Sequence, residues 1–291
     1  MQAQGKTLFN GLSGLAGSWI FLGLPFSLGT VHAQTGTELA ADQIRQISYI
    51  KNFKKNGLVN LANANKTLSS KFITDLGNFE YVTGYDLQLY FRKLSILIGK
   101  IIKLNKRIIT IGGDHSLTYA LLMGIVKEKK SIQVLHIDAH QDMQKPNLSL
   151  NPTHADFISR LLRNQRIERI FQLGVRGFSD KIEKHRKLVR INHLNSVDMI
   201  AALIDKTKPI YISFDVDAID PSECFATNFC EPDGLSMKFI EELITFLIKN
   251  KFEILGIDIM EYNPTLDKNL ICGKKLSNFL TQILIAAESS C

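Results

Sequence analysis

Short apolar runs alternate along the chain with longer amphipathic stretches, and this alternation limits the possible folds more than any other feature. The apolar runs lack the polar alternation of half-exposed strands, which is typical of parallel strands covered on both faces. Crossover helices between such strands pack on the two sides of the sheet. We therefore predict an α/β fold with three αβα layers and a mostly parallel central sheet. The expected strands lie at 19–24, 107–111, 132–137, 169–175, 209–214 and 253–259, and the expected helices at 38–48, 85–104, 117–129, 155–165, 237–250 and 276–288.

Length and composition fit one globular domain. The chain has 291 residues, of which 45% are hydrophobic and 22% are charged, so it can bury a sizeable core. It shows no internal repeat, linker or low-complexity tract, and we expect residues 1–291 to form a single domain. The net charge of +7 comes from scattered Lys and Arg without interleaved aromatic residues, which does not indicate a nucleic-acid partner.

The first apolar run allows two interpretations. Residues 14–33 are mostly apolar, and Val31-His32-Ala33 is similar to a signal-peptide cleavage site. However, glycines and Pro25 interrupt the stretch, which favours a buried first strand over 19–24 that ends before Pro25. No apolar run reaches the ~18 uninterrupted residues that a membrane helix needs, and we expect no membrane association.

The cysteine spacing fits neither a zinc ribbon nor a disulfide framework, because no two cysteines form a C-x-x-C pair. We expect free thiols in a reducing compartment and therefore a cytoplasmic protein. Cys224 and Cys230 lie close enough in sequence to leave a local bridge between them open. The other two cysteines are Cys272 and Cys291.

Ionisable residues cluster directly after four of the expected strands. Loops that follow parallel strands meet at the carboxyl edge of the sheet, where α/β proteins bind their ligands. Residues at i, i+2 and i+4 of an extended chain also point the same way, so the Asp and His of one cluster can converge on one point. The four segments are Gly112-Gly113-Asp114-His115-Ser116, Asp138-Ala139-His140-Gln141-Asp142, Asp215-Val216-Asp217-Ala218-Ile219-Asp220-Pro221 and Met260-Glu261-Tyr262-Asn263-Pro264.

Together these segments predict a metal site. Buried carboxylates and imidazoles that face one another need positive charge between them, and divalent ions supply it. Four Asp and two His form a mostly hard-oxygen set without thiolate, which suits Mn²⁺ better than a structural zinc or a copper ion. The set is too large for one ion with an open position, and two ions ~3.5–4 Å apart with shared carboxylates fit it. The six expected ligands are His115, Asp138, His140, Asp142, Asp215 and Asp217.

The same segments resemble the three signature motifs of the ureohydrolase superfamily, which comprises arginases, agmatinases and formimidoylglutamases. The motifs are Gly-Gly-Asp-His-Ser at 112–116, His-Ile-Asp-Ala-His-x-Asp at 136–142 and Ser-Phe-Asp-Val-Asp-Ala-Ile-Asp-Pro at 213–221. Further similar stretches extend the resemblance from about residue 19 to the end of the chain. The resemblance implies an arginase-like fold and a hydrolase that releases urea from a guanidinium group.

The resemblance also implies roles for individual residues. Asp138 and Asp215 would be shared between two Mn²⁺ ions, and Asp142 would also orient the attacking hydroxide. Glu261 would pair with the substrate guanidinium, and His154 would carry a proton to the leaving amine. Members of the family usually form trimers or hexamers, so a homo-oligomer is implied. The first ion would lie between His115, Asp138, Asp142 and Asp215, and the second between Asp138, His140, Asp215 and Asp217.

Departures from the arginase pattern concern the substrate. Gln144 stands where free-arginine arginases carry Asn, and Leu150-Asn151-Pro152 replaces their Ser-Gly-Asn. Ser179 stands at the place of the arginase acid that helps to hold the substrate α-amino group. We therefore expect a guanidino substrate whose α-groups are absent or modified, such as an arginine inside a peptide. Gln144, Ser179 and Glu261 are the expected substrate-binding residues.

Other functions remain as alternatives. Agmatine or another small guanidino compound is one alternative substrate, and free L-arginine is another. A zinc deacetylase of related fold would keep one metal, whereas all six ligands of a two-metal site are present here. A non-catalytic arginase-like binding subunit would have lost a ligand. A screen for urea release would separate these functions.

Overall fold

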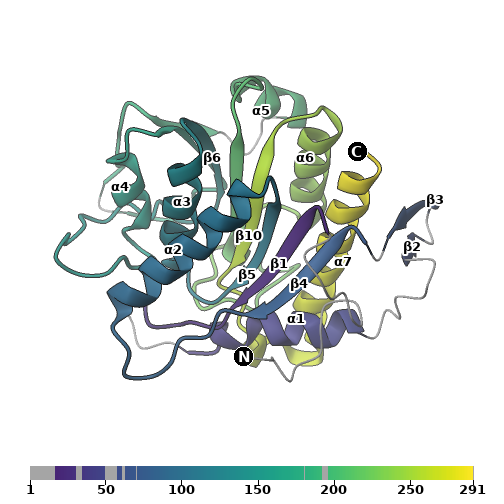
Figure 1. Ribbon diagram of the computed structural model, residues 1–291, viewed down its shortest axis with the longest axis horizontal. Helices are drawn as coiled ribbons and strands as arrows, with labels where there is room; N and C mark the ends of the chain where they lie inside the picture. Colours follow the sequence, from purple (N-terminus) through teal and green to yellow (C-terminus); the bar gives the residue numbers. More distant parts are fainter. Residues whose placement is uncertain are drawn as a thin grey trace.

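The computed structural model describes residues 17–30, 35–49, 58–60, 63–69, 71–179, 181–191 and 196–290 of the chain. Its centre is a sheet of eight strands in which every neighbouring pair runs parallel (Figure 1). The strand order is β4-β1-β5-β10-β9-β6-β7-β8. The strands are β1 (Trp19–Leu24), β4 (Ile73–Asn78), β5 (Arg107–Gly112), β6 (Ile132–Ile137), β7 (Ile167–Leu173), β8 (Leu188–Ile191), β9 (Ile210–Asp215) and β10 (Ile254–Met260), and a separate antiparallel pair is formed by β2 (Leu58–Asn60) and β3 (Asn63–Leu68).

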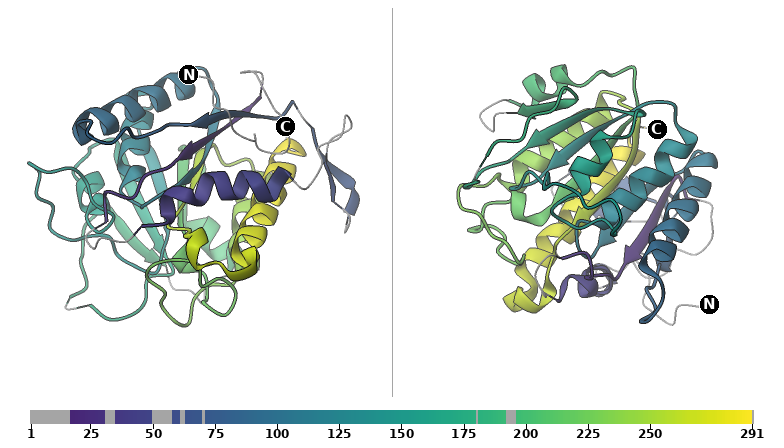
Figure 2. Two further views of the ribbon diagram at one scale, coloured as in Figure 1. Left: turned by 90° about the horizontal axis from the view of Figure 1, so that it is seen from below. Right: turned by 90° about the vertical axis from the view of Figure 1, so that its left-hand side faces the viewer.

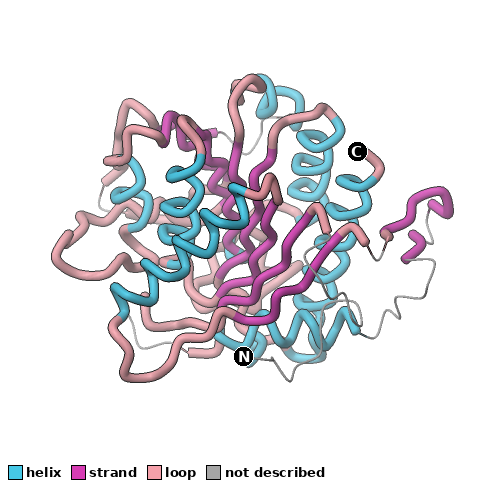
Figure 3. The backbone as a smooth tube through the Cα atoms, viewed as in Figure 1, coloured by secondary structure: helices cyan, strands magenta, loops and turns pink. Residues whose placement is uncertain are grey.

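Helices cover both faces of this sheet, which confirms the predicted three-layer αβα fold (Figures 2 and 3). Alternate residues of β1 face opposite sides: Ile20 and Leu22 enter one core, and Trp19 and Phe21 enter the other. None of the helices in the described ranges has the length and apolar character needed to span a membrane. The first core lies under α2 (Leu87–Lys103), α3 (Leu117–Glu128) and α4 (Phe157–Leu162), and the second under α1 (Ala40–Tyr49), α5 (Val197–Leu203), α6 (Met237–Lys249) and α7 (Ile271–Glu288).

The interpretation of 19–24 as a buried strand is confirmed. All six residues of β1 are buried, and β1 pairs with β4 on one side and with β5 on the other. Val31-His32-Ala33, the candidate cleavage site, lies outside the described residues.

Several elements differ from the sequence prediction. The edge strands β4 and β8, the helix α5 and the β2–β3 pair were not expected, because none of them has a long apolar run. β7 begins two residues before the expected start at 169, and α7 begins at Ile271 instead of 276. The helix expected at 155–165 is shorter, because the loop that follows Asp142 continues to Asp156.

The described cysteines are free thiols. Cys224 and Cys272 are buried and Cys230 is exposed, so the local bridge between Cys224 and Cys230 is not formed. Cys291 lies outside the described residues.

The four strands that precede the ionisable segments are direct neighbours. β5, β10, β9 and β6 stand side by side at the centre of the sheet, and all of them are parallel. Their carboxyl ends therefore meet at one edge. This arrangement brings together segments that are up to about 150 residues apart in sequence.

Candidate active site

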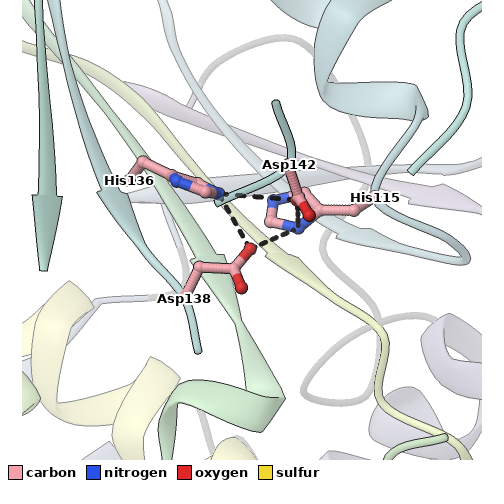
Figure 4. Close-up of side chains that lie close together, drawn as sticks. All are labelled: His115, His136, Asp138 and Asp142. Atoms are coloured by element: carbon pink, nitrogen blue, oxygen red, sulfur yellow. Dashed lines mark ion pairs between the residues drawn. The ribbon is translucent and has the colours of Figure 1, made fainter. Parts of the chain in front are cut away.

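His115 is at the centre of the first cluster of possible metal ligands. Its Nδ1 atom lies 3.1 Å from Asp138 Oδ2, 2.9 Å from Asp215 Oδ2 and 3.4 Å from Asp142 Oδ2. Figure 4 shows His115, Asp138 and Asp142 directed toward one another, together with His136. The donor atoms of His115, His136, Asp138 and Asp142 all lie within 4.8 Å of one another, which is close enough to hold one ion.

A second cluster shares Asp138 with the first. His140 Nδ1 lies 2.8 Å from Asp217 Oδ2 and 3.6 Å from Asp138 Oδ1. The donor atoms of Asp138, His140 and Asp217 again lie within 4.8 Å of one another. Asp138 thus offers one oxygen to each cluster, as a carboxylate shared by two ions would.

The ligands converge through turns, so the extended geometry predicted from their spacing is wrong. β6 ends at Ile137, and Asp142 has a left-handed backbone with φ of 50°. This conformation is uncommon for a non-glycine residue, although Asp adopts it more readily than most. Asp215 ends β9 and is followed by a short 3-10 helix, in which the Asp217 N–H donates to Asp215 Oδ1 at 2.8 Å.

The buried carboxylates need compensating positive charge. Burial, with the negative charges of Asp217 and Asp138, raises the pKa of Asp215 well above its usual range. Burial and the charge of Asp138 raise the pKa of Asp142 to about 6. In addition, His115 Nδ1 and Asp138 Oδ2 are buried without a hydrogen-bond partner. Buried lone pairs without a hydrogen-bond partner and crowded hard oxygens fit divalent cations such as Mn²⁺.

A chain of hydrogen bonds determines which nitrogen of His115 faces the cluster. His115 Nε2 lies 2.9 Å from Ser213 Oγ, and the Ser213 hydroxyl donates to Asp258 Oδ1 at 2.8 Å. Because the hydroxyl proton is committed to Asp258, Ser213 Oγ accepts from His115 Nε2–H. The lone pair of Nδ1 is therefore left for a metal, which is the usual arrangement behind metal-bound histidines.

His136 was not expected in the site. Its Nε2 atom lies 2.8 Å from Asp138 Oδ2 and 3.7 Å from Asp142 Oδ2, and its Nδ1 atom lies 3.2 Å from the Gln172 amide nitrogen. His136 lies inside the expected strand 132–137, whereas the predicted ligands of this segment all follow it. His136 stands two residues before Asp138, on the same side of β6, and this period of two is the signal that could have identified it.

Glu261 and His154 face each other beside the metal ligands. Glu261 Oε1 accepts the His115 N–H at 2.8 Å and lies 3.6 Å from His154 Nδ1, whereas Glu261 Oε2 is buried without a hydrogen-bond partner. Glu261 also has a left-handed backbone, with φ of 62°. Burial lowers the pKa of His154, but the hydrogen bond to Glu261 and its charge outweigh burial and raise the pKa above its usual value.

A cavity of about 670 Å³ opens over these groups. Its described lining contains every residue predicted for the site except Asp138, which is completely buried. Gln144 and Ser179 line its outer part and are exposed. Two further lining side chains, Phe229 and the fully exposed Phe178, were not predicted, because single aromatic residues in loops carry no spacing signal.

Comparison with known proteins agrees with this geometry. Residues 18–285 match the arginase family. Human mitochondrial guanidino acid hydrolase is 28% identical over 280 residues, which cover 91% of this chain and 77% of that protein. The agmatinase of Blochmanniella floridana is 27% identical over 265 residues, which cover 86% and 81% of the two chains. The structure of proclavaminate amidino hydrolase from Streptomyces clavuligerus superposes with a TM-score of 0.81, at 21% identity and 99% coverage of both chains. The chain therefore belongs to the arginase family, whose members are hydrolases that act on the C–N bonds of guanidino groups.

Proposed function

We propose that this protein is a two-manganese ureohydrolase that acts on an arginine side chain inside a peptide or otherwise modified at its α-groups. Water adds to the guanidinium carbon, and the bond from that carbon to the side-chain nitrogen breaks. The products are urea and an ornithine-type amine. The shared position of Asp138 between two ligand clusters supports two ions, and the outer part of the cavity supports the choice of substrate.

The first ion would be held by His115, Asp138, Asp142 and Asp215, which the distances from His115 support. The second would be held by Asp138, His140 and Asp217, which lie close together, with Asp215 as the carboxylate proposed to be shared. When bound, the ions supply positive charge that lowers the pKa of water toward neutrality. Asp142 lies at the cavity wall and can orient that water by accepting a hydrogen bond from it.

Glu261 would bind the guanidinium group. Its Oε1 atom is fixed by the His115 N–H, and its Oε2 atom is the buried acceptor that has no partner within the described structure. A carboxylate oxygen in this state is completed by a guanidinium N–H, since charge-assisted hydrogen bonds of this kind are strong and directional. Glu261 would thus hold the guanidinium carbon near the metal ligands without blocking its other face.

His154 would protonate the leaving amine. Its ring lies within 3.6 Å of Glu261 Oε1 and lines the cavity, so a guanidinium bound to Glu261 would bring its nitrogens close to the imidazole. Despite burial, the Glu261 carboxylate raises the pKa of His154 above its usual value, which favours the protonated imidazole that this step needs. The amine must accept a proton when the C–N bond breaks, and a histidine suits this step.

The cavity mouth supports a substrate with altered α-groups. Gln144 and Ser179 are neutral, so neither offers a charged partner at the positions where free-arginine enzymes hold the α-groups. The volume of about 670 Å³ falls in the range that holds drug-sized ligands, which is larger than a single small amine needs. The mouth is also lined by Lys145, Arg176 and Lys181, of which Lys181 pairs with the lining residue Glu183 at 2.6 Å. The excess of positive charge disfavours agmatine, whose far end is an ammonium group.

The same cations favour a second candidate, a small guanidino acid, whose carboxylate would meet them. The relative that is 28% identical is named a guanidino acid hydrolase. We retain the peptide as the first candidate because the wide mouth and the exposed Phe178 offer contacts that a small acid would not use.

A urea-release assay over free arginine, agmatine, guanidinobutyrate and arginine-containing peptides tests the proposal. Hydrogen bonds to charged groups contribute ~1.5–3 kcal/mol each, and the neutral Gln144 and Ser179 leave two such contacts unmade for free arginine. Its kcat/KM should therefore be at least ~100-fold below that of the best peptide. Glu261→Ala should abolish urea release from every substrate, whereas Glu183→Ala at the rim should not. If free arginine were the best substrate and the peptides were inert, the proposal would be wrong and the protein would be an ordinary arginase.

We also propose a cellular compartment and an oligomeric state for the enzyme. The free thiols of the described cysteines support a reducing, cytoplasmic compartment. We also infer a homo-oligomer, a trimer or hexamer, from membership in the family. Light scattering on the purified protein measures this directly.

A further inference from the structure

A second cavity, of about 740 Å³, lies on the outer side of α2 and α3, where the loop between Asp142 and His154 crosses them. One loop separates the two cavities. Gln144 and Lys145 line the active-site cavity, and Leu148 and Leu150 line the second. Three residues lead from Lys145 to Leu148, which corresponds to at most about 11 Å of extended chain. A ligand of a few residues can therefore reach from one cavity to the other.

The charged side chains in the described lining of the second cavity are all basic. Four basic side chains line it, and no Asp or Glu is found among the described residues of its lining. Arg160 is neutralised by Asp156, whose Oδ2 atom lies 2.8 Å from Arg160 Nη2. The other three make no ion pair with another described residue, although Lys127 donates to Ser95 Oγ at 3.2 Å and Arg166 donates to the Val126 carbonyl. These three cations are Arg92, Lys127 and Arg166.

Apolar side chains and amides complete the lining. Leu148 and Leu150 are 56% and 63% exposed, so they offer apolar surface that a bound segment can cover. Asn151 and Asn164 add amide groups at the cavity wall. Amides can satisfy the N–H and C=O groups of a peptide backbone, which a hydrocarbon chain does not carry.

We propose that the second cavity is a docking site for a peptide segment that carries acidic and apolar side chains and belongs to the same molecule as the target arginine. This inference rests on the proposed peptide substrate. Carboxylates of the segment would pair with Arg92, Lys127 and Arg166, and its apolar side chains would cover Leu148 and Leu150. A second copy related by a two-fold axis is a poor occupant, because that contact would place like charges opposite each other. A three-fold contact with another copy is one of the outcomes that the test below distinguishes.

The test uses three peptides with the same arginine-containing core and different tails. One tail contains Glu and Leu, one contains Lys and Leu, and one contains only Gly and Ser. We expect the acidic tail to lower KM at least tenfold relative to the Gly-Ser tail, with little change in kcat, and the gain to fade as salt screens the charges. The Lys tail should give no gain.

Matched variants assign the effect to the cavity. The double variant Arg92→Glu with Lys127→Glu should abolish the gain and leave the Gly-Ser peptide unaffected. The control, Lys93→Glu with Lys130→Glu, makes the same charge change with exposed residues of the same region that do not line the cavity, and it should retain the gain. An arginine-free acidic tail peptide, labelled for fluorescence anisotropy, should bind the wild type and the control but not the cavity variant.

The outcomes separate this inference from the proposed function. Absence of urea from all three peptides would contradict the peptide substrate, and the anisotropy measurement would still report on the docking site. Urea from all three with equal KM would overturn the docking site alone. So would tail peptides that bind the cavity variant as well as the wild type. A change of oligomeric mass in the cavity variant would overturn it too, because the surface would then be an interface between copies.

Discussion

The ionisable side chains of the site are each held by one atom, which leaves another atom for a ligand. His115 is bound through Nε2 to Ser213, and Nδ1 faces the carboxylates. Glu261 is bound through Oε1 to the His115 N–H, and Oε2 has no partner. Asp138 gives one oxygen to each cluster. This arrangement orients the groups before metal and substrate arrive, so that little reorganisation is needed when they bind.

Metal content should depend most on the shared carboxylates. Asp138→Asn and Asp215→Asn keep the side-chain volume but each remove a ligand of both ions, whereas His115→Ala removes a ligand of one. We expect close to two Mn²⁺ per wild-type chain and a larger loss in the two Asn variants than in His115→Ala. Elemental analysis after dialysis measures this, and chelation should remove activity that Mn²⁺ restores. One tightly held Zn²⁺ in an enzyme active as isolated would contradict the two-ion arrangement.

The pKa of His154 should depend on Glu261. The Glu261 carboxylate raises this pKa, so the stability that the pair contributes is fully present below the ordinary histidine pKa of about 6.5 and is lost as the pH rises through the raised value. Glu261→Gln removes the negative charge, and the pKa of His154 should fall. Histidine NMR titrations of both metal-free proteins, assigned with His154→Gln, report the change. An unchanged pKa would mean that other charges control His154.

At the scale of whole elements, the sequence predicts those that lie in the interior and misses those at the edges. β1, β5, β6, β9 and β10 are continuous apolar runs, because helices cover both of their faces. β4 has buried residues only in its first half, and β8 has a single buried residue. An edge strand needs less apolar surface, so its sequence lacks the signal that identifies a central strand.

For the candidate site, too, the sequence predicts only part of what the structure contains. The candidate ligands that follow strand ends were predicted from their clustering, and the structure brings them together through turns that the sequence did not indicate. His136 and Asp258 lie inside buried strands, and each forms part of the hydrogen-bonded or charged surroundings of the cluster. A polar residue in an apolar run identifies a buried network, but the sequence does not show which partner lies across the sheet.

The loop that carries His154 is held by one buried arginine. Arg160, on α4, donates to the backbone carbonyls of Asn147, Leu150 and Asn151, and it pairs with Asp156. Asp156 in turn accepts the Thr153 N–H at 2.9 Å, immediately before His154. Arg160 and Asp156 therefore hold the loop backbone in one shape, and the fixed loop in turn positions the His154 imidazole.

Arg160→Lys should loosen this loop while keeping a positive charge beside Asp156. A lysine cannot bond three carbonyls and a carboxylate at once, so His154 should lose its fixed position. We expect kcat to fall about tenfold with little change in KM, because proton delivery depends on position. Added imidazole should restore part of kcat. The exposed Arg163→Lys serves as the control, and a variant that changes only KM would show that the loop acts on binding instead.

At the scale of the whole molecule, the sheet order is what creates the site. β5 and β10 are about 150 residues apart in sequence but neighbours in the sheet, and β9 and β6 continue the same row. β1 supports this row from one side, because it pairs directly with β5 and packs into the cores on both faces. The position of the Gly112–Ser116 turn therefore depends on a strand that contributes no ligand.

Deletion of residues 1–33 should consequently give an insoluble or unfolded protein. The deletion removes Trp19, Ile20, Phe21, Leu22 and Leu24, each at most 2% exposed. Burial of one large apolar side chain contributes about 1.5–3 kcal/mol, so these five contribute on the order of 10 kcal/mol. That amount is comparable with the net stability of a domain, about 5–15 kcal/mol. Deletion of residues 1–16 keeps every described strand and should leave circular dichroism and urea release unchanged. A soluble and fully active protein that begins at Gln34 would show that β1 is dispensable and would restore the signal-peptide interpretation of this segment.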